Sequence, residues 1–322
     1  MIEGHNQLKL IRYIWIDVLK GLAILAVLVD HHGLSFAKYC VYSVPVFFLI
    51  LGFNSYNSIS KNNDSSVLGR LISCTNFFVF YIISTTIYLI ESGKFSFPEL
   101  YKNIVFFSVS APFYFCAIYL QLCLFSCITY KILIKIKQKN NLFFAKNWAA
   151  IYLILLVGFY FISLGMKKIV IFPDLHGGGK YLLGATYLFL MLAGMLISSK
   201  YKNLYEWKNL IFYMALGILC LSPFYINSIW ANPPKFMTCI YAISIFLVVA
   251  FSPIIWGGLF SKIFSFIGKY SIHIFMYHIL VMKYTSSFES KAISFLLAIT
   301  IPILVGIVLD FIVLRKRLQF RI

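Results

Sequence analysis

The sequence predicts an all-α, polytopic transmembrane bundle of about ten helices with both termini in the cytoplasm. The first observation is composition: of 322 residues, 61% are hydrophobic and 12% are charged, whereas soluble domains have about 45–50% and about 25%. The second is a mean hydropathy of +0.88. The third is that the apolar residues form long continuous runs, as membrane-spanning helices do. These values exclude a soluble globular enzyme and a disordered chain.

Ten apolar segments are long enough to be considered as spans, each near the length of about 20 residues that a bilayer needs. They cover residues 13–31, 39–56, 71–91, 110–132, 148–166, 181–199, 209–229, 236–256, 263–283 and 291–313. An alternative start of the fourth segment lies further back, in the apolar stretch near Phe106 and Phe107. The polar stretches Ser58–Asp64 and Lys135–Asn141 are expected to be loops. We expect a single integral membrane domain over residues 1–322, with no soluble domain.

The distribution of positive charge sets the expected orientation. The termini and the loops after even-numbered segments carry 18 of the 28 Lys and Arg residues, and the loops after odd-numbered segments carry 9. Because cytoplasmic loops are enriched in Lys and Arg, both termini are expected in the cytoplasm. The net charge of +18 is dispersed between apolar runs, so we expect membrane lipids rather than nucleic acid as its partner. The seven cysteines show no metal-ligand spacing, and no metal site is expected.

The first segment holds the most unusual charges, because Asp17, Lys20, Asp30 and His31 all lie within it. Ionisable residues inside a span are costly and are functional candidates by default. Lys20 and His31 are about 20° apart around a helix and about 16 Å apart along it, so they share one face. Asp17 is one turn before Lys20 and is positioned to pair with it. Histidine suits general-base chemistry near neutral pH, and a cation suits an anionic cofactor.

Other candidates lie in later segments. Arg70 begins the third segment on the predicted cytoplasmic side, where a guanidinium suits phosphate. Ser271 and His278 are seven residues apart and share a helix face in the ninth segment. Two predicted outer loops offer groups that suit an acceptor: Asp174 and His176 in a glycine-rich stretch, and Trp230 before two prolines.

Several of these stretches together resemble the acyltransferase-3 membrane family. In this sequence the similar stretches are Asp17 to Ala23 with His31, Ser43 to Phe48 with Gly52 and Phe53, Phe113 to Gln121, Leu192 to Met195, and Gly268 to Ser271 with Tyr277 and His278. The family's first helix carries a basic residue, ten intervening residues and a histidine, and Lys20 and His31 match that spacing. The matches run from end to end of the chain.

The resemblance implies transfer of an acyl group, usually acetyl, from cytoplasmic acyl-coenzyme A to a sugar hydroxyl of a surface glycan or its lipid-linked precursor. It implies that His31 is catalytic, that Lys20 and Arg70 bind the donor, and that Asp17, Tyr114, Gln121, Ser271, Tyr277 and His278 support them. Acetyl-coenzyme A is then a co-substrate, and no cofactor is bound permanently. The family's arginine pair at the third helix is half present, since Val67 replaces one arginine and Lys61 is a possible substitute. The SGNH esterase-like domain of some relatives is absent from these residues.

Two mechanisms remain open: His31 acts as general base, or it carries the acyl group as an acyl-imidazole. Two other functions are also compatible with a polar first helix, namely a transporter or flippase and a polymerase of lipid-linked glycans. The expected location is the inner, cytoplasmic membrane, as a multi-pass protein.

Overall fold

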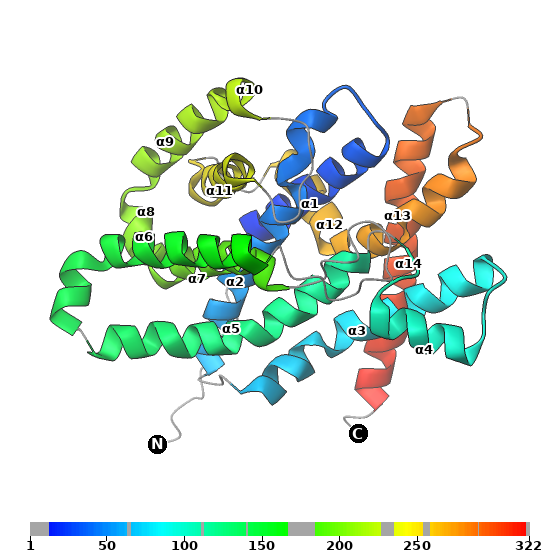
Figure 1. The fold of residues 1–322 in the computed structure, drawn as a ribbon. Coiled ribbons are helices and arrows are strands. Elements are labelled where there is room, and N and C mark those ends of the chain that lie inside the picture. The colour runs from blue at the N-terminus through cyan, green and yellow to red at the C-terminus, as the bar shows by residue number, and fades with distance from the viewer. Residues whose placement is uncertain are drawn as a thin grey trace, which may run out of the picture.

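A computed structural model describes residues 13–62, 66–110, 113–139, 141–166, 184–226, 235–253, 258–288 and 290–319. Within these ranges every regular element is a helix (Figure 1). In chain order they are α1 (Ile14–His31), η1 (Ala37–Tyr42), α2 (Ser43–Asn62), α3 (Val67–Glu91), α4 (Phe97–Phe106), α5 (Tyr114–Lys139), α6 (Asn141–Met166), η4 (Gly184–Tyr187), α7 (Leu188–Ser199), α8 (Tyr201–Glu206), α9 (Lys208–Cys220), α10 (Ser222–Tyr225), α11 (Phe236–Phe251), α12 (Leu259–Lys269), α13 (Ser271–Thr285) and α14 (Lys291–Gln319). The all-α prediction is confirmed for these residues.

Ten membrane spans were predicted, but fewer helices among the described residues are both long enough and apolar enough to be spans. Four stretches are long and apolar enough to cross a membrane: Ala37–Lys61, Cys74–Glu91, Tyr114–Ile136 and Lys291–Ile312. The bent pair α12 and α13 gives a fifth if the two helices form one span. Four further apolar helices, among them α9 and α11, are shorter. Helix α1 has 18 residues but includes Asp17, Lys20 and Asp30. The count of ten and the orientation therefore stay predictions, whereas a multi-pass helical membrane protein is supported.

The ninth predicted segment is not one straight helix, and this part of the prediction is wrong. Helix α12 ends at Lys269, α13 begins at Ser271, and the two axes differ by 72°. Tyr270 between them has φ −99° and ψ 10°, outside regular helical geometry. Apolar residues flank the bend on both sides, and the polar interruption at Lys269 to Ser271 is too short to divide the predicted segment. The bend separates an amphipathic α12 from the buried α13.

The fourth predicted segment also does not extend backward to Phe106. Those residues belong to a separate helix, α4, which Ser96 caps by accepting a hydrogen bond from the Glu99 N–H. The helix stops at Phe107, whose φ of 51° is left-handed. The expected loops also differ, because α2 continues to Asn62, α5 continues to Lys139 and α6 begins at Asn141.

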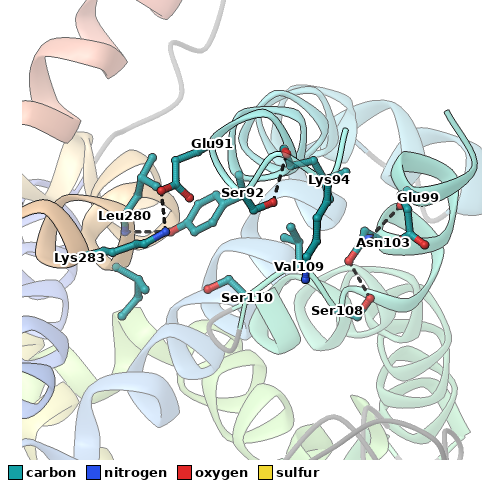
Figure 2. Close-up of a pocket in the computed structure, with 13 residues that line it drawn as sticks. Glu91, Ser92, Lys94, Glu99, Asn103, Ser108, Val109, Ser110, Leu280 and Lys283 are labelled. Atoms are coloured by element: carbon teal, nitrogen blue, oxygen red, sulfur yellow. Dashed lines mark hydrogen bonds and ion pairs between the residues drawn. The ribbon is translucent and has the colours of Figure 1, made fainter. Parts of the chain in front are cut away.

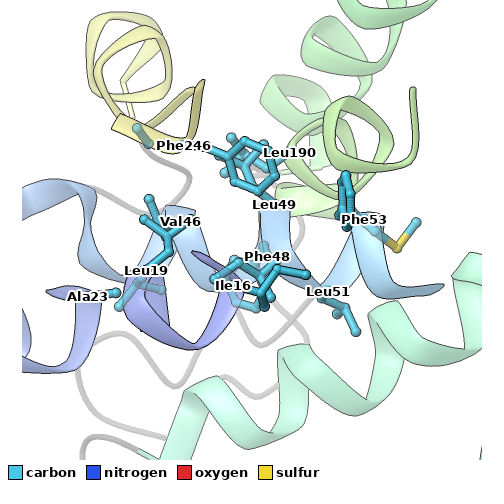
Figure 3. Close-up of a cluster of buried hydrophobic side chains, with 14 of the residues drawn as sticks. Ile16, Leu19, Ala23, Val46, Phe48, Leu49, Leu51, Phe53, Leu190 and Phe246 are labelled. Carbon is cyan, nitrogen blue, oxygen red and sulfur yellow. The ribbon is translucent and has the colours of Figure 1, made fainter. Parts of the chain in front are cut away.

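The core is centred on α1, α2, α7 and α11, where large apolar side chains interdigitate (Figure 3). Two helix crossings are closed by glycines. Gly52 of α2 and Gly194 of α7 pack against each other's helices, at the backbones of Met191 and Leu49. Gly21 of α1 and Gly268 of α12 make an equivalent crossing. Small residues allow such close approach in membrane bundles, where lipid removes the hydrophobic drive between helices.

Candidate active site

The end of α1 is fixed by a glycine. Gly33 has φ 58°, its N–H bonds to the Asp30 carbonyl at 3.0 Å, and the Leu34 N–H bonds to the Val29 carbonyl at 3.2 Å. This pair of hydrogen bonds is the Schellman arrangement that terminates helices. His31 is therefore the last residue of α1, and its exposed side chain lies in the final helical turn.

The structure brings two of the predicted site residues together, His31 of α1 and His278 of α13. Their ring centroids are 5.1 Å apart and the rings are inclined by 44°. His31 is exposed, whereas His278 is fully buried, at 0% exposure. One imidazole is thus accessible and the second lies behind it in the protein interior.

Hydrogen bonds define the state of the buried ring. Nδ1 of His278 lies 3.0 Å from the Ile274 carbonyl and 2.8 Å from the Phe275 carbonyl. Since carbonyl oxygens only accept, Nδ1 carries the proton and donates it. Nε2 is then an acceptor, and it is buried with no hydrogen-bond partner among the described residues. A buried acceptor without a partner is costly, which makes it a candidate for a role in catalysis.

His32, the neighbour of His31, takes part in a hydrogen-bond network that holds helices together. Nδ1 of His32 is 2.8 Å from the Leu28 carbonyl, and Nε2 is 3.3 Å from the Ser294 hydroxyl. Ser294 also lies 2.6 Å from Thr285 Oγ1, so the network joins α1, α13 and α14. The sequence analysis missed Ser294. No local pattern reveals it, because 262 residues separate it from His32.

Asp17 and Lys20 form the predicted pair, with 3.4 Å between Lys20 Nζ and Asp17 Oδ1. Asp17 is 4% exposed, while the Lys20 side chain is 29% exposed. Ile24 and Val27, which lie between Lys20 and His31 on the shared face, are both buried. A donor that extends from Lys20 to His31 must therefore pass through the packed interior of the bundle.

Arg70 lies in the first turn of α3, as predicted, and its Nη2 donates to the Ser58 hydroxyl of α2 at 3.0 Å. It is only 8% exposed. Arg70 thus ties α3 to α2. Val67, in the place of the second arginine, is exposed, and so is Lys61.

The remaining predicted residues fall into three groups. Tyr114 begins α5 and lies close enough to Asp30 for an electrostatic interaction, which places it near the C-terminal end of α1. The Gln121 Oε1 accepts a hydrogen bond from the Gly184 N–H at 2.7 Å, which ties α5 to η4. Ser271 and Tyr277 are both buried in α13, and Tyr277 packs in an aromatic cluster with α3.

Asp174, His176 and Trp230 lie outside the described residues. In the described part of the chain, no group of three His, Cys, Asp or Glu side chains is arranged to hold a metal ion.

The apolar helices and the ionisable residues of α1 define a multi-pass membrane protein with a polar site inside its helical bundle. The sequence profile of the acyltransferase-3 family, described as an acyltransferase domain, matches residues 13–314. The chain therefore belongs to the acyltransferase-3 family, and the resemblance found in the sequence is confirmed. This membership favours an acyltransferase over a transporter or a polymerase. No match was found among curated proteins or among solved structures.

Proposed function

We propose that this membrane acyltransferase is an O-acetyltransferase. It moves acetyl from cytoplasmic acetyl-coenzyme A to a hydroxyl of a cell-surface polysaccharide or of its lipid-linked precursor. The family supplies the reaction class. The observation that carries the assignment of the site is the contact between His31 and His278 at the end of α1.

In the proposed reaction His31 is the general base. Its neutral imidazole takes the proton of the sugar hydroxyl while that oxygen attacks the thioester carbonyl. The carbon–sulfur bond of the tetrahedral intermediate then breaks, and the coenzyme A thiolate leaves with the electron pair. The imidazolium of His31 returns the proton to that thiolate. The products are the O-acetyl sugar and free coenzyme A, and both protons and electrons balance.

His278 is proposed as the positioning residue for His31. Its Nδ1–H is committed to the Ile274 and Phe275 carbonyls, so its Nε2 presents a lone pair inside the protein. When His31 becomes imidazolium, both of its ring nitrogens carry protons. A small rotation of His31 allows one N–H to reach Nε2 of His278 while the other N–H remains for the thiolate. Neutral His31 already carries one N–H that can face this lone pair. The hydrogen bond strengthens when His31 becomes charged, so the pair would stabilise the imidazolium more than the neutral ring, as catalysis requires.

On the donor side, Lys20 and Arg70 are proposed to hold the phosphates of coenzyme A. Asp17 is held at the crossing of α1 and α12 and fixes Lys20. Charge-assisted contacts of this kind suit phosphate oxygens. In the proposed orientation Lys20 lies toward the cytoplasm and His31 toward the outer face of the inner membrane. Donor and acceptor then approach from opposite sides.

The test measures free thiol released from acetyl-coenzyme A by the purified protein in lipid vesicles, with and without a crude cell-surface glycan fraction. Wild-type protein should release thiol in a glycan-dependent way. His31→Ala should lower kcat by about 10²–10⁴-fold, the usual contribution of general acid–base catalysis.

Two controls make the test decisive. His32→Gln changes the adjacent histidine and should keep most of the activity, because His32 serves the network with Ser294. Imidazole added to His31→Ala should restore part of the rate. Thiol release that is the same in His31→Ala and wild type would move the chemistry to another residue. No release with any glycan or acyl donor would contradict the proposed function.

A further inference from the structure

A cavity of about 350 Å³ with many polar and charged lining residues lies between the ends of three helices (Figure 2). Its walls come from the end of α3, from α4, from the segment that precedes α5, and from α13. We call it the α3–α4–α13 pocket. Its volume is within the range of about 300–1,000 Å³ that small-molecule sites have.

The lining is balanced in charge, in contrast to the rest of the chain. Glu91 and Glu99 contribute two negative charges, and Lys94 and Lys283 contribute two positive charges. The whole chain has a net charge of +18 and only ten acidic residues. A neutral pocket in a strongly cationic protein does not favour a phosphate or another anion over an uncharged ligand.

The polar groups stand on two opposite sides of the cavity (Figure 2). On one side Lys283 Nζ lies 2.6 Å from Glu91 Oε1. On the other side Asn103 donates to the Glu99 carbonyl at 2.8 Å and accepts from the Ser108 hydroxyl at 2.9 Å. The Tyr88 side chain also lines the cavity. Carboxylates, an amide, hydroxyls and an aromatic ring around one space are the groups that bind a polyol, which needs both donors and acceptors.

Helix α13 connects this pocket to the histidine pair. Ile279 and Leu280 follow His278 directly and line the pocket, and Lys283 lies about 7.5 Å further along the helix axis. These three residues point about 100–160° away from His278 around the helix. A ligand in the pocket therefore lies beside the same helix end as the site, yet it does not contact His31.

We propose that the α3–α4–α13 pocket binds an uncharged sugar unit of the acceptor glycan, next to the unit that receives the acyl group. This inference rests on the proposed function. It explains why the cavity is polar and neutral, and why α13 carries the histidine on one side and the pocket wall on another.

Binding is measured first, without turnover. The His31→Ala protein in phosphatidylcholine nanodiscs is titrated with uncharged oligosaccharides of two to six hexose units, and binding is followed by saturation-transfer NMR. Ser110→Trp fills the cavity and removes the hydrogen bond between Ser110 and Tyr88, and Glu99→Gln removes one charge with little change of shape. Each should weaken oligosaccharide binding by at least about tenfold. Lys262→Ala, an exposed change on α12, should bind like the parent.

Kinetic measurements distinguish oligosaccharide binding in the pocket from the acyl-transfer reaction. In the active protein, Ser110→Trp should raise KM for the oligosaccharide by at least about tenfold and leave KM for acetyl-coenzyme A unchanged. Three results would overturn the pocket assignment. The parent protein does not bind the oligosaccharides, both pocket variants bind them as well as the parent does, or only glycerophosphoethanolamine displaces them. Pocket binding without glycan-dependent thiol release would instead retain the pocket and reject the acyl transfer.

Discussion

Gly268 of α12 packs directly against the backbone of Asp17, the residue whose carboxylate holds Lys20. A Cβ atom at Gly268 would overlap the Asp17 carbonyl oxygen, and a Cβ atom at Gly21 would overlap the Phe264 carbonyl oxygen. Backbone atoms cannot move aside as the end of a flexible side chain can. Lys20, the cation proposed to bind the donor, is thus positioned by a helix crossing that leaves no room for a Cβ atom at either glycine.

Gly268→Ala should therefore destabilise the protein by at least about 1–3 kcal/mol, the usual cost of overpacking. It should also raise KM for acetyl-coenzyme A, because Asp17 and Lys20 shift with the crossing. The matched control is Gly217→Ala in α9, where a Cβ meets no atom within 4 Å. That change should be neutral or stabilising by up to about 1 kcal/mol, since alanine favours helix. Thermal unfolding in detergent distinguishes them, and equal melting temperatures would contradict the tight crossing.

Lys20→Ala should raise KM for acetyl-coenzyme A about tenfold or more, because a charged hydrogen bond contributes about 1.5–3 kcal/mol. The loss should be smaller with acetyl-dephospho-coenzyme A if Lys20 contacts the phosphate that this analogue lacks. Lys38→Ala, an exposed lysine beyond α1, is the control and should leave KM unchanged. If Lys20→Ala lowered kcat and left KM for acetyl-coenzyme A unchanged, Lys20 would not bind the donor.

His278→Phe keeps a ring of similar size and removes Nε2. We expect kcat to fall about 10–100-fold, as for residues that orient a catalytic group, with KM for the donor unchanged. His273→Phe makes the same change in the same helix, at a ring that packs 4.6 Å from Phe80 and has no contact with His31 in the structure. This control should keep its kcat. Equal losses in both variants would mean that α13 is merely sensitive to substitution.

Gly33→Ala places a side chain at a residue with φ 58°, which costs about 1–2 kcal/mol. Gly93→Ala, at φ 68° after α3, repeats the change in the same kind of helix terminus. Both variants should lose similar thermal stability. Only Gly33→Ala should lose kcat in thiol release, because only that terminus sets the position of His31. Retained kcat in Gly33→Ala would show that the end of α1 does not need this geometry.

Hydropathy was sufficient to predict an all-helical membrane bundle, because membrane-spanning helices need long apolar runs. It did not predict the bend at Tyr270 or the separate α4. Both depend on the backbone conformation of single residues, Tyr270 and Phe107, and the polar residues beside them are too few to interrupt the hydropathy of the segment. Local propensity carries little information about such breaks when tertiary packing decides them.

The candidate site was also predicted only in part: relationships within one helix were predicted, and contacts between distant helices were not. The helical repeat placed Lys20 and His31 on one face, and the pairing of Asp17 with Lys20 followed from their spacing. The contact between His31 and His278 needs α1 beside α13, which periodicity does not encode. The α3–α4–α13 pocket was missed for a related reason, since its groups come from distant segments. Glu91 and Glu99 could have indicated the pocket, because they are two of only ten acidic residues and are close in sequence.

The glycine crossing of α1 and α12 also constrains assembly during synthesis. Helix α1 is made long before α12, the helix that closes over Gly21 and Asp17. Ionisable residues in lipid are costly until protein surrounds them. The nascent chain must therefore hold Asp17 and Lys20 in an incomplete environment until α12 has been translated. A truncated product that lacks α12 would expose these charges, which makes it a natural target for membrane quality control.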